Sequence, residues 1–120
     1  MAGKKIMVVD DEKDIRDTVK DLLLDNDFEV ETAENGKDLL KKLQKTKPDL
    51  IILDILMPGL TTYEILSKIK EKKIKTPIIF LTVVRFAEQT RNIITDNMID
   101  YIEKPFDNKD LIKRVKNALM

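Results

Sequence analysis

The chain has 120 residues, of which 42% are hydrophobic and 37% charged, and its 22 basic and 22 acidic side chains give a formal net charge of zero. This length and apolar content suit one globular domain with its own core, and the balanced charge disfavours a large nucleic-acid interface, which normally needs a basic excess. The absence of Cys and His excludes disulfides, thiolate chemistry, histidine catalysis and a phosphohistidine on this chain.

Five strands are predicted along the chain. Uninterrupted apolar runs at residues 6–9, 50–53 and 78–81 are typical of strands buried on both faces of a parallel sheet. Weaker strand patterns occupy residues 29–33 and 100–102.

Five helices are predicted between and after these strands, because apolar residues recur there at helical spacing. The groups are Ile15, Val19, Leu22 and Leu23; Leu39, Leu40 and Leu43; Ile65, Leu66 and Ile69; Ile93, Ile94 and Met98; and Leu111, Ile112, Val115 and Leu119. Thr61 and Glu64 have the spacing of a capping box at the start of the third helix, and Asp107 is placed to cap the last helix after Pro105.

Strand and helix therefore alternate five times, which predicts an α/β doubly wound parallel sheet with right-handed crossovers. We find no linker or internal repeat and expect residues 1–120 to form a single domain. The longest apolar runs are four residues, too short to cross a membrane. No apolar stretch precedes Ile6 that could act as a signal peptide, so we expect a cytoplasmic protein without membrane partners.

Polar side chains follow four of the predicted strands, at the edge where ligands bind in such sheets. Asp10, Asp11 and Glu12 follow the first strand, Asp54 the third, Thr82 the fourth and Lys104 the fifth. A first loop with three carboxylates and no Gly repels a phosphate or a flavin, but it suits Mg²⁺, which prefers oxygen ligands.

Asp54 ends an apolar strand, so its carboxylate is held rigidly and can act as a nucleophile that forms an acyl phosphate. Lys104 and a metal ion would offset the charge of the phosphoryl group, and the Thr82 hydroxyl can donate to a phosphoryl oxygen. Gly59, after Pro58, permits the turn that carries the chain past this site.

These residues stand in four segments: Val8-Val9-Asp10-Asp11, residues 53–59, Leu81-Thr82 and residues 100–106. In this order, and at these strand ends, the chain resembles a response-regulator receiver domain of two-component signalling over nearly its whole length. The resemblance implies a flavodoxin-like fold with five helices and strand order 2-1-3-4-5. It also implies a phospho-accepting signalling domain, of the kind that acts alone in chemotaxis and phosphorelays, rather than an enzyme. Such a domain catalyses only its own Mg²⁺-dependent phosphorylation and dephosphorylation.

The resemblance also assigns roles within the site. Asp54 would take a phosphoryl group from a histidine kinase or a His-phosphotransfer protein. Asp11, Asp54 and the backbone carbonyl of Leu56 would bind Mg²⁺ directly, and Asp10 would bind it through water. Thr82 and Lys104 would contact the phosphoryl group.

Signalling would then pass through a switch formed by Thr82 and Tyr101, which remodels the surface of the fourth helix, fifth strand and fifth helix. Because no output domain is evident, either a separate protein target or a missing output domain would receive the signal. Three alternatives are an aspartyl-nucleophile phosphatase, a flavin-binding module and a pseudo-receiver with a fixed binding surface. The first lacks its strand-1 motif here, the acidic first loop disfavours the second, and Val83 leaves the third open.

Several positions depart from the usual receiver pattern. Thr61-Thr62 replaces a frequent Asp-Gly, and Val83 replaces a small residue beside the site, where it could restrict the switch or shield the acyl phosphate from water. Arg85-Phe86 replaces a small polar loop, and Asn97 stands where Gly is usual. The family also leads us to expect a cis Lys104-Pro105 bond. The lysines that end the third helix are expected to form a solvated face.

Overall fold

The computed structural model describes residues 3–55, 59–82 and 98–120, except for the side chain of Thr82. Its elements are β1 (Lys5–Val9), α1 (Lys13–Asp25), β2 (Glu29–Ala33), α2 (Gly36–Lys42), β3 (Leu50–Leu53), α3 (Thr62–Glu71), β4 (Ile78–Thr82), β5 (Met98–Glu103) and α5 (Asn108–Ala118). The five strands form one parallel sheet in the order β2-β1-β3-β4-β5, as predicted.

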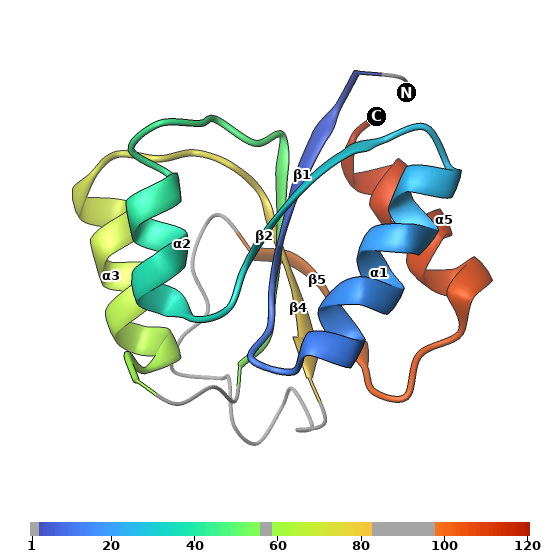
Figure 1. Ribbon diagram of the computed structural model, residues 1–120. Coiled ribbons are helices and arrows are strands. Elements are labelled where there is room, and N and C mark those ends of the chain that lie inside the picture. Colours follow the sequence, from blue (N-terminus) through green and yellow to red (C-terminus); the bar gives the residue numbers. More distant parts are fainter. Residues whose placement is uncertain (1–2, 56–58, 83–97) are drawn as a thin grey trace.

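The sheet is the middle layer of three (Figure 1). One face is covered by α1 and α5, and the other by α2 and α3. Within the described residues the chain forms four of the five predicted helices. The predicted fourth helix, with Ile93 and Ile94, lies outside them.

Met98 was assigned wrongly from the sequence, because it is the first residue of β5 and not part of a helix. It pairs with Ile78 of β4, and its side chain packs against the core. The predicted helix rested on only Ile93, Ile94 and Met98. So few apolar residues cannot distinguish a helix from a strand at position 98.

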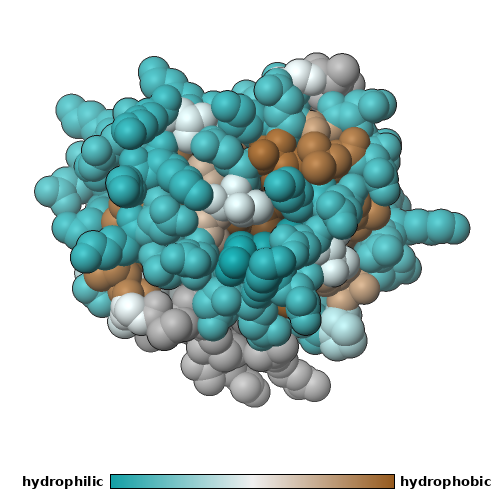
Figure 2. Space-filling model, viewed as in Figure 1, coloured by the Kyte–Doolittle hydropathy of each residue, from teal (hydrophilic) through white to brown (hydrophobic). Residues whose placement is uncertain are grey.

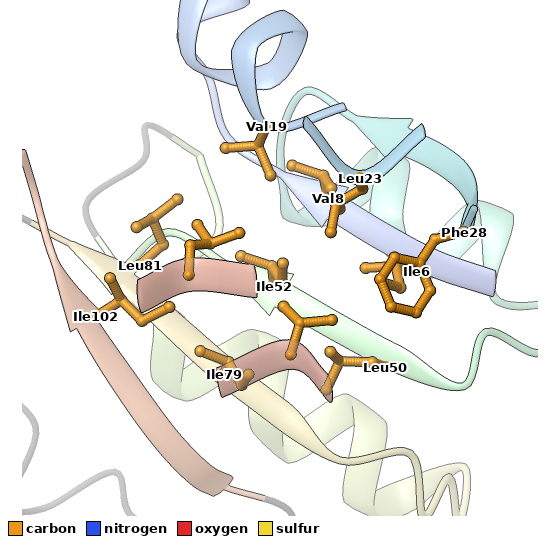
Figure 3. Close-up of a cluster of buried hydrophobic side chains, with 12 residues drawn as sticks. Ile6, Val8, Val19, Leu23, Phe28, Leu50, Ile52, Ile79, Leu81 and Ile102 are labelled. Atoms are coloured by element: carbon orange, nitrogen blue, oxygen red, sulfur yellow. The ribbon is translucent and has the colours of Figure 1, made fainter. Parts of the chain in front are cut away.

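Each central strand contributes to two separate apolar clusters, because successive side chains point to opposite faces. Ile6 and Val8 of β1 face the α1–α5 side, whereas Met7 and Val9 face α2 and α3. Figure 3 shows the first cluster, in which Val19 and Leu23 of α1 lie over the strands. This two-sided burial explains why the strand sequences are continuously apolar.

The predicted helix starts are confirmed. The Thr61 side chain accepts the backbone N–H of Glu64, and the Glu64 side chain accepts the backbone N–H of Thr61, which together make the capping box. Asp107 caps α5 by accepting the N–H of Lys109. The Lys104-Pro105 bond is cis, and Gly59 has a φ of +92°, a conformation that few other residues adopt readily.

The face seen in Figure 2 is mostly hydrophilic, with an apolar patch toward its upper right. No helix of the described residues is long and apolar enough to cross a membrane.

Candidate functional site

Asp10 and Asp54 lie side by side at the carboxyl ends of β1 and β3, and both are buried. Their backbones extend the hydrogen bonding of the sheet: the N–H of Asp10 donates to the carbonyl of Ala33 at 3.2 Å, and that of Asp54 donates to the carbonyl of Val9 at 3.0 Å. The two carboxylates are therefore fixed by the sheet, and the predicted position of each is confirmed.

Lys104 joins these two carboxylates from the end of β5. Its Nζ lies 2.7 Å from Oδ2 of Asp10 and 3.5 Å from Oδ2 of Asp54. Burial lowers the pKa of Lys104, but the hydrogen bond to Asp10 and the charges of Asp54 and Asp10 outweigh it and hold this pKa above its usual value. The ammonium group is therefore charged at neutral pH, in the midst of the carboxylates.

The loop after β1 forms an acidic cluster of Asp10, Asp11 and Glu12, in which one carboxylate oxygen from each residue lies within 4.8 Å of the other two. Asp10 is committed to protein partners: Oδ1 accepts the N–H of Glu12 at 2.9 Å, and Oδ2 faces Lys104. Asp11 and Glu12 are exposed. Glu12 is the N-cap residue of α1, but its side chain makes no capping hydrogen bond.

These groups suit a hard divalent cation, because all of the ligand atoms are oxygens. The carboxylate of Asp10 is buried and held by hydrogen bonds, whereas those of Asp11 and Glu12 are exposed to solvent. Arg16 steadies the loop from the side, since its Nη1 donates to the carbonyl of Asp10 at 2.7 Å. The residues present therefore fit the predicted Mg²⁺ site, although Lys104 already balances part of the negative charge.

The segment after Asp54 is held by a contact that sequence reasoning missed. The buried hydroxyl of Thr62 donates to the carbonyl of Ile55 at 2.7 Å, which ties the start of α3 to the residue next to Asp54. Thr62 was noted only as a departure from the family pattern. A hydroxyl at a helix start close to a strand end was the available indication, but the partner depends on the tertiary fold.

The remaining predicted residues are only partly described. Thr82 is the last residue of β4 and pairs with Glu103, but its side chain lies outside the described part. Tyr101 pairs with Phe80, and its half-buried ring packs on the cluster under α2 and α3. The Leu56 carbonyl also lies outside the described residues, as do Val83, Arg85, Phe86 and Asn97.

A doubly wound sheet with a buried aspartate, an acidic loop and a lysine at its carboxyl edge defines a class of signalling domain. The family model named Response regulator receiver domain matches residues 6–116. The chain belongs to this family, the receiver domains of two-component signal transduction.

Individual relatives agree with this assignment. The response regulator SaeR of Staphylococcus epidermidis is 37% identical over 114 residues, which cover 95% of this chain and 49% of SaeR. The chain thus spans about half the length of the curated relatives it matches first.

Solved structures agree as well. The chemotaxis protein CheY4 of Vibrio cholerae is 33% identical with a TM-score of 0.90, and the match covers 98% of this chain and 100% of that one. The response regulator TrrA of Thermotoga maritima, solved in complex with Mg²⁺ and BeF, is 38% identical with a TM-score of 0.82. That match covers 97% of this chain and 99% of TrrA.

Proposed function

We propose that Asp54 is the phosphoacceptor of this receiver domain. The observation that carries the proposal is the position of its buried carboxylate, 3.5 Å from the Lys104 ammonium at the end of a rigid strand. An Asp54 carboxylate oxygen attacks the phosphorus of a phosphohistidine on a kinase or phosphotransfer protein. The P–N bond breaks as the P–O bond forms, and the imidazole leaves with its electron pair and takes up a proton.

Asp11, Asp54 and the Leu56 carbonyl would hold Mg²⁺ directly, and Asp10 would hold it through water. Both oxygens of Asp10 already have protein partners, which supports its indirect role. When bound, the ion offsets the negative charge of the carboxylates and of the phosphoryl oxygens. The solution of TrrA in complex with Mg²⁺ and BeF supports the use of Mg²⁺ by this domain.

Lys104 would contact a phosphoryl oxygen from the opposite side. Its ammonium is already positioned by Asp10, so no rearrangement is needed to present the charge. The Thr82 hydroxyl would donate to another phosphoryl oxygen. Movement of Thr82 and Tyr101 would then change the surface that includes β5 and α5.

The output of this reaction is a conformation rather than a released product. The domain would catalyse only its own Mg²⁺-dependent phosphorylation and dephosphorylation, in the cytoplasm. A protein target, or an output domain joined to the receiver, would read the changed surface. We propose no direct contact of residues 1–120 with nucleic acid, because their net charge is zero.

The test is phosphorylation by acetyl phosphate, followed by intact mass. We expect a gain of one phosphoryl group with Mg²⁺, and none with EDTA or in Asp54→Ala. Asp21→Ala removes an exposed carboxylate from α1 and serves as the matched control, which should be phosphorylated normally. If folded wild-type protein gains no phosphoryl group under any condition, the chain is a pseudo-receiver and the proposal is wrong.

A further inference from the structure

A pocket lies between the C-terminal ends of α2 and α3, on the edge of the sheet opposite Asp54. Its volume is about 310 Å³. In Figure 1 this edge holds the start of β1 and the C-terminus, and the strands run away from it. Asp54 follows the far, carboxyl end of β3. The pocket therefore shares no residue with the proposed phosphorylation site.

Four exposed lysines form the rim of this pocket: Lys47, Lys72, Lys73 and Lys75. Among the described residues, none of the four forms an ion pair with a carboxylate. The carboxylate of Asp49, which follows Pro48 in the chain, accepts the backbone N–H of Lys5 at 2.8 Å. Lys72, Lys73 and Lys75, which follow α3, are exposed as expected of a solvated face, but the fold also groups them with Lys47 around a shared hollow.

The helix dipoles do not account for this concentration of charge. A helix C-terminus carries a partial charge of roughly −0.5, whose effect fades within the last turn. Lys68 and Lys70 occupy the last turn of α3 and suffice for that role, whereas Lys47 and Lys75 lie beyond the helix ends. Two such termini offset roughly one of the four ammonium charges, so a positive field remains at the pocket.

The chain turns sharply at Lys73, on the rim of the pocket. Lys73 has a φ of +59°, a left-handed conformation in which Gly is usual after a helix. The neighbouring N–H of Ile74 donates to the carbonyl of Ile69 at 3.1 Å and closes the helix end. Residues other than Gly rarely adopt this conformation, and the side chain at this position is a long cation beside the pocket.

The floor of the pocket is apolar. It is formed by Leu43, Pro48 and Ile74, which are half-buried or buried. The hydroxyl of Thr76 donates to the carbonyl of Pro48 at 3.3 Å, which fixes the wall between floor and rim. A cationic rim over an apolar floor matches a ligand with phosphate groups at one end and an apolar ring at the other.

We propose that this pocket binds a small polyphosphate ester, such as a nucleoside polyphosphate, independently of the phosphoacceptor site. The volume lies at the lower end of the range for small-molecule sites. Lysine ammonium groups are common point-charge partners of phosphate. A compact hollow favours a small ligand over an acidic polypeptide, which needs a longer groove.

The test is a titration of ¹⁵N-labelled protein with ATP in EDTA, which keeps metal from drawing the nucleotide to the acidic edge. We expect saturable amide shifts at Thr46, Ile74 and Thr76. Adenosine should bind far more weakly because it has no phosphates. Tripolyphosphate should also bind more weakly than ATP because it has no ring for the apolar floor.

Two variants of equal net charge make the comparison specific. Lys47→Gln/Lys73→Gln removes two rim charges and should weaken ATP binding about tenfold. Lys20→Gln/Lys37→Gln removes two exposed lysines of α1 and α2 outside the rim and should leave it unchanged. Equal weakening in both variants, shifts scattered over the surface, or no shifts would overturn the proposal. So would a hexaglutamate peptide that saturates these amides when ATP does not, since it would identify the surface as a protein interface.

Discussion

Lys104 and Asp10 are 94 positions apart in the chain, yet the lysine Nζ lies 2.7 Å from Oδ2 of the aspartate. In the sheet, β3 and β4 stand between β1 and β5, so the Lys104 side chain reaches across the carboxyl ends of both. Only 9% of the Lys104 side chain and 1% of the Asp10 side chain are exposed. Because this pair is shielded from water, its loss should be far more costly than that of a surface ion pair.

Lys104→Met should destabilise the metal-free domain by about 3–5 kcal/mol, since it leaves buried carboxylates without a counter-charge. The partners of Lys104 hold its pKa above the usual value. Its stabilising charge is therefore complete at neutral pH and is lost only as the pH rises through that higher pKa. The measurement is urea unfolding at neutral pH in EDTA.

Saturating Mg²⁺ should recover part of this loss, because the ion supplies positive charge to the same carboxylates. The matched control is Lys109→Met at an exposed position of α5, which we expect to change stability by no more than about 0.5 kcal/mol. If Lys104→Met costs no more than the control in EDTA, the buried pair does not stabilise the domain.

Gly36 is the first residue of α2 and packs directly against Ile65 of α3. A Cβ at position 36 would lie 2.5 Å from Cδ1 and 2.6 Å from Cγ1 of Ile65. Ile65 is fully buried and β-branched, so it has little freedom to move aside. Gly36→Ala should therefore cost about 1–3 kcal/mol by overpacking, more than the gain of up to about 1 kcal/mol in helix propensity.

A double-mutant cycle in thermal or urea unfolding separates these two effects. In an Ile65→Ala background the space around position 36 is free, so Gly36→Ala should become neutral or stabilising there. If Gly36→Ala destabilises both backgrounds equally, the close approach of α2 and α3 is not the cause.

The strands and the positions of Asp10 and Asp54 at their ends could be predicted because they depend on local patterns, whereas the strand order followed only from the family resemblance. Asp10 and Asp54 each follow an apolar run, and in a parallel sheet the ends of such runs meet at one edge. The assignment of Met98 failed because one apolar residue fits a helix and a strand equally well. The strand it belongs to is defined by pairing with β4, which is a tertiary contact.

Two side-chain contacts could not be predicted because they too depend on the tertiary arrangement of the elements. Thr62 donates to a backbone carbonyl, and carbonyls carry no sequence identity. Arg114 is one of several charged residues on α5, and nothing in its spacing pointed to β5 as the partner. Such interactions depend on how the helices pack on the sheet.

Thr62→Val should lower stability by about 1–3 kcal/mol, because the buried carbonyl of Ile55 loses its hydroxyl donor while the shape of the side chain is kept. It should also slow phosphorylation by acetyl phosphate, since Ile55 adjoins Asp54. Thr62→Ser keeps the hydroxyl and should retain most of both properties. A Val variant as stable as the wild type, with the loss confined to Ser, would show that the methyl group matters rather than the hydrogen bond.

Arg114 of α5 pairs with one carboxylate in β5, which joins the two elements, and with a second carboxylate in its own helix. Its Nη1 lies 2.7 Å from Oδ1 of Asp100 in β5, and its Nε lies 3.0 Å from Oδ2 of Asp110 in α5. Asp110 and Asp100 hold the pKa of Arg114 above its usual value. Because these side chains are only partly exposed, we expect a coupling of about 0.5–1 kcal/mol between Arg114 and Asp100 at low salt.

The measurement is a cycle of Arg114→Gln and Asp100→Asn in urea unfolding, repeated at high salt, where the coupling should shrink through screening. The Lys13–Asp17 pair of α1 is the comparison. Its Nζ–Oδ2 distance of 2.8 Å is close to that of the Arg114–Asp100 pair, but its side chains are 76% and 53% exposed. That pair should show the smaller coupling, since water and salt reach it from all sides. A coupling at Arg114 no larger than at Lys13 would mean that the link between α5 and β5 depends on apolar packing alone.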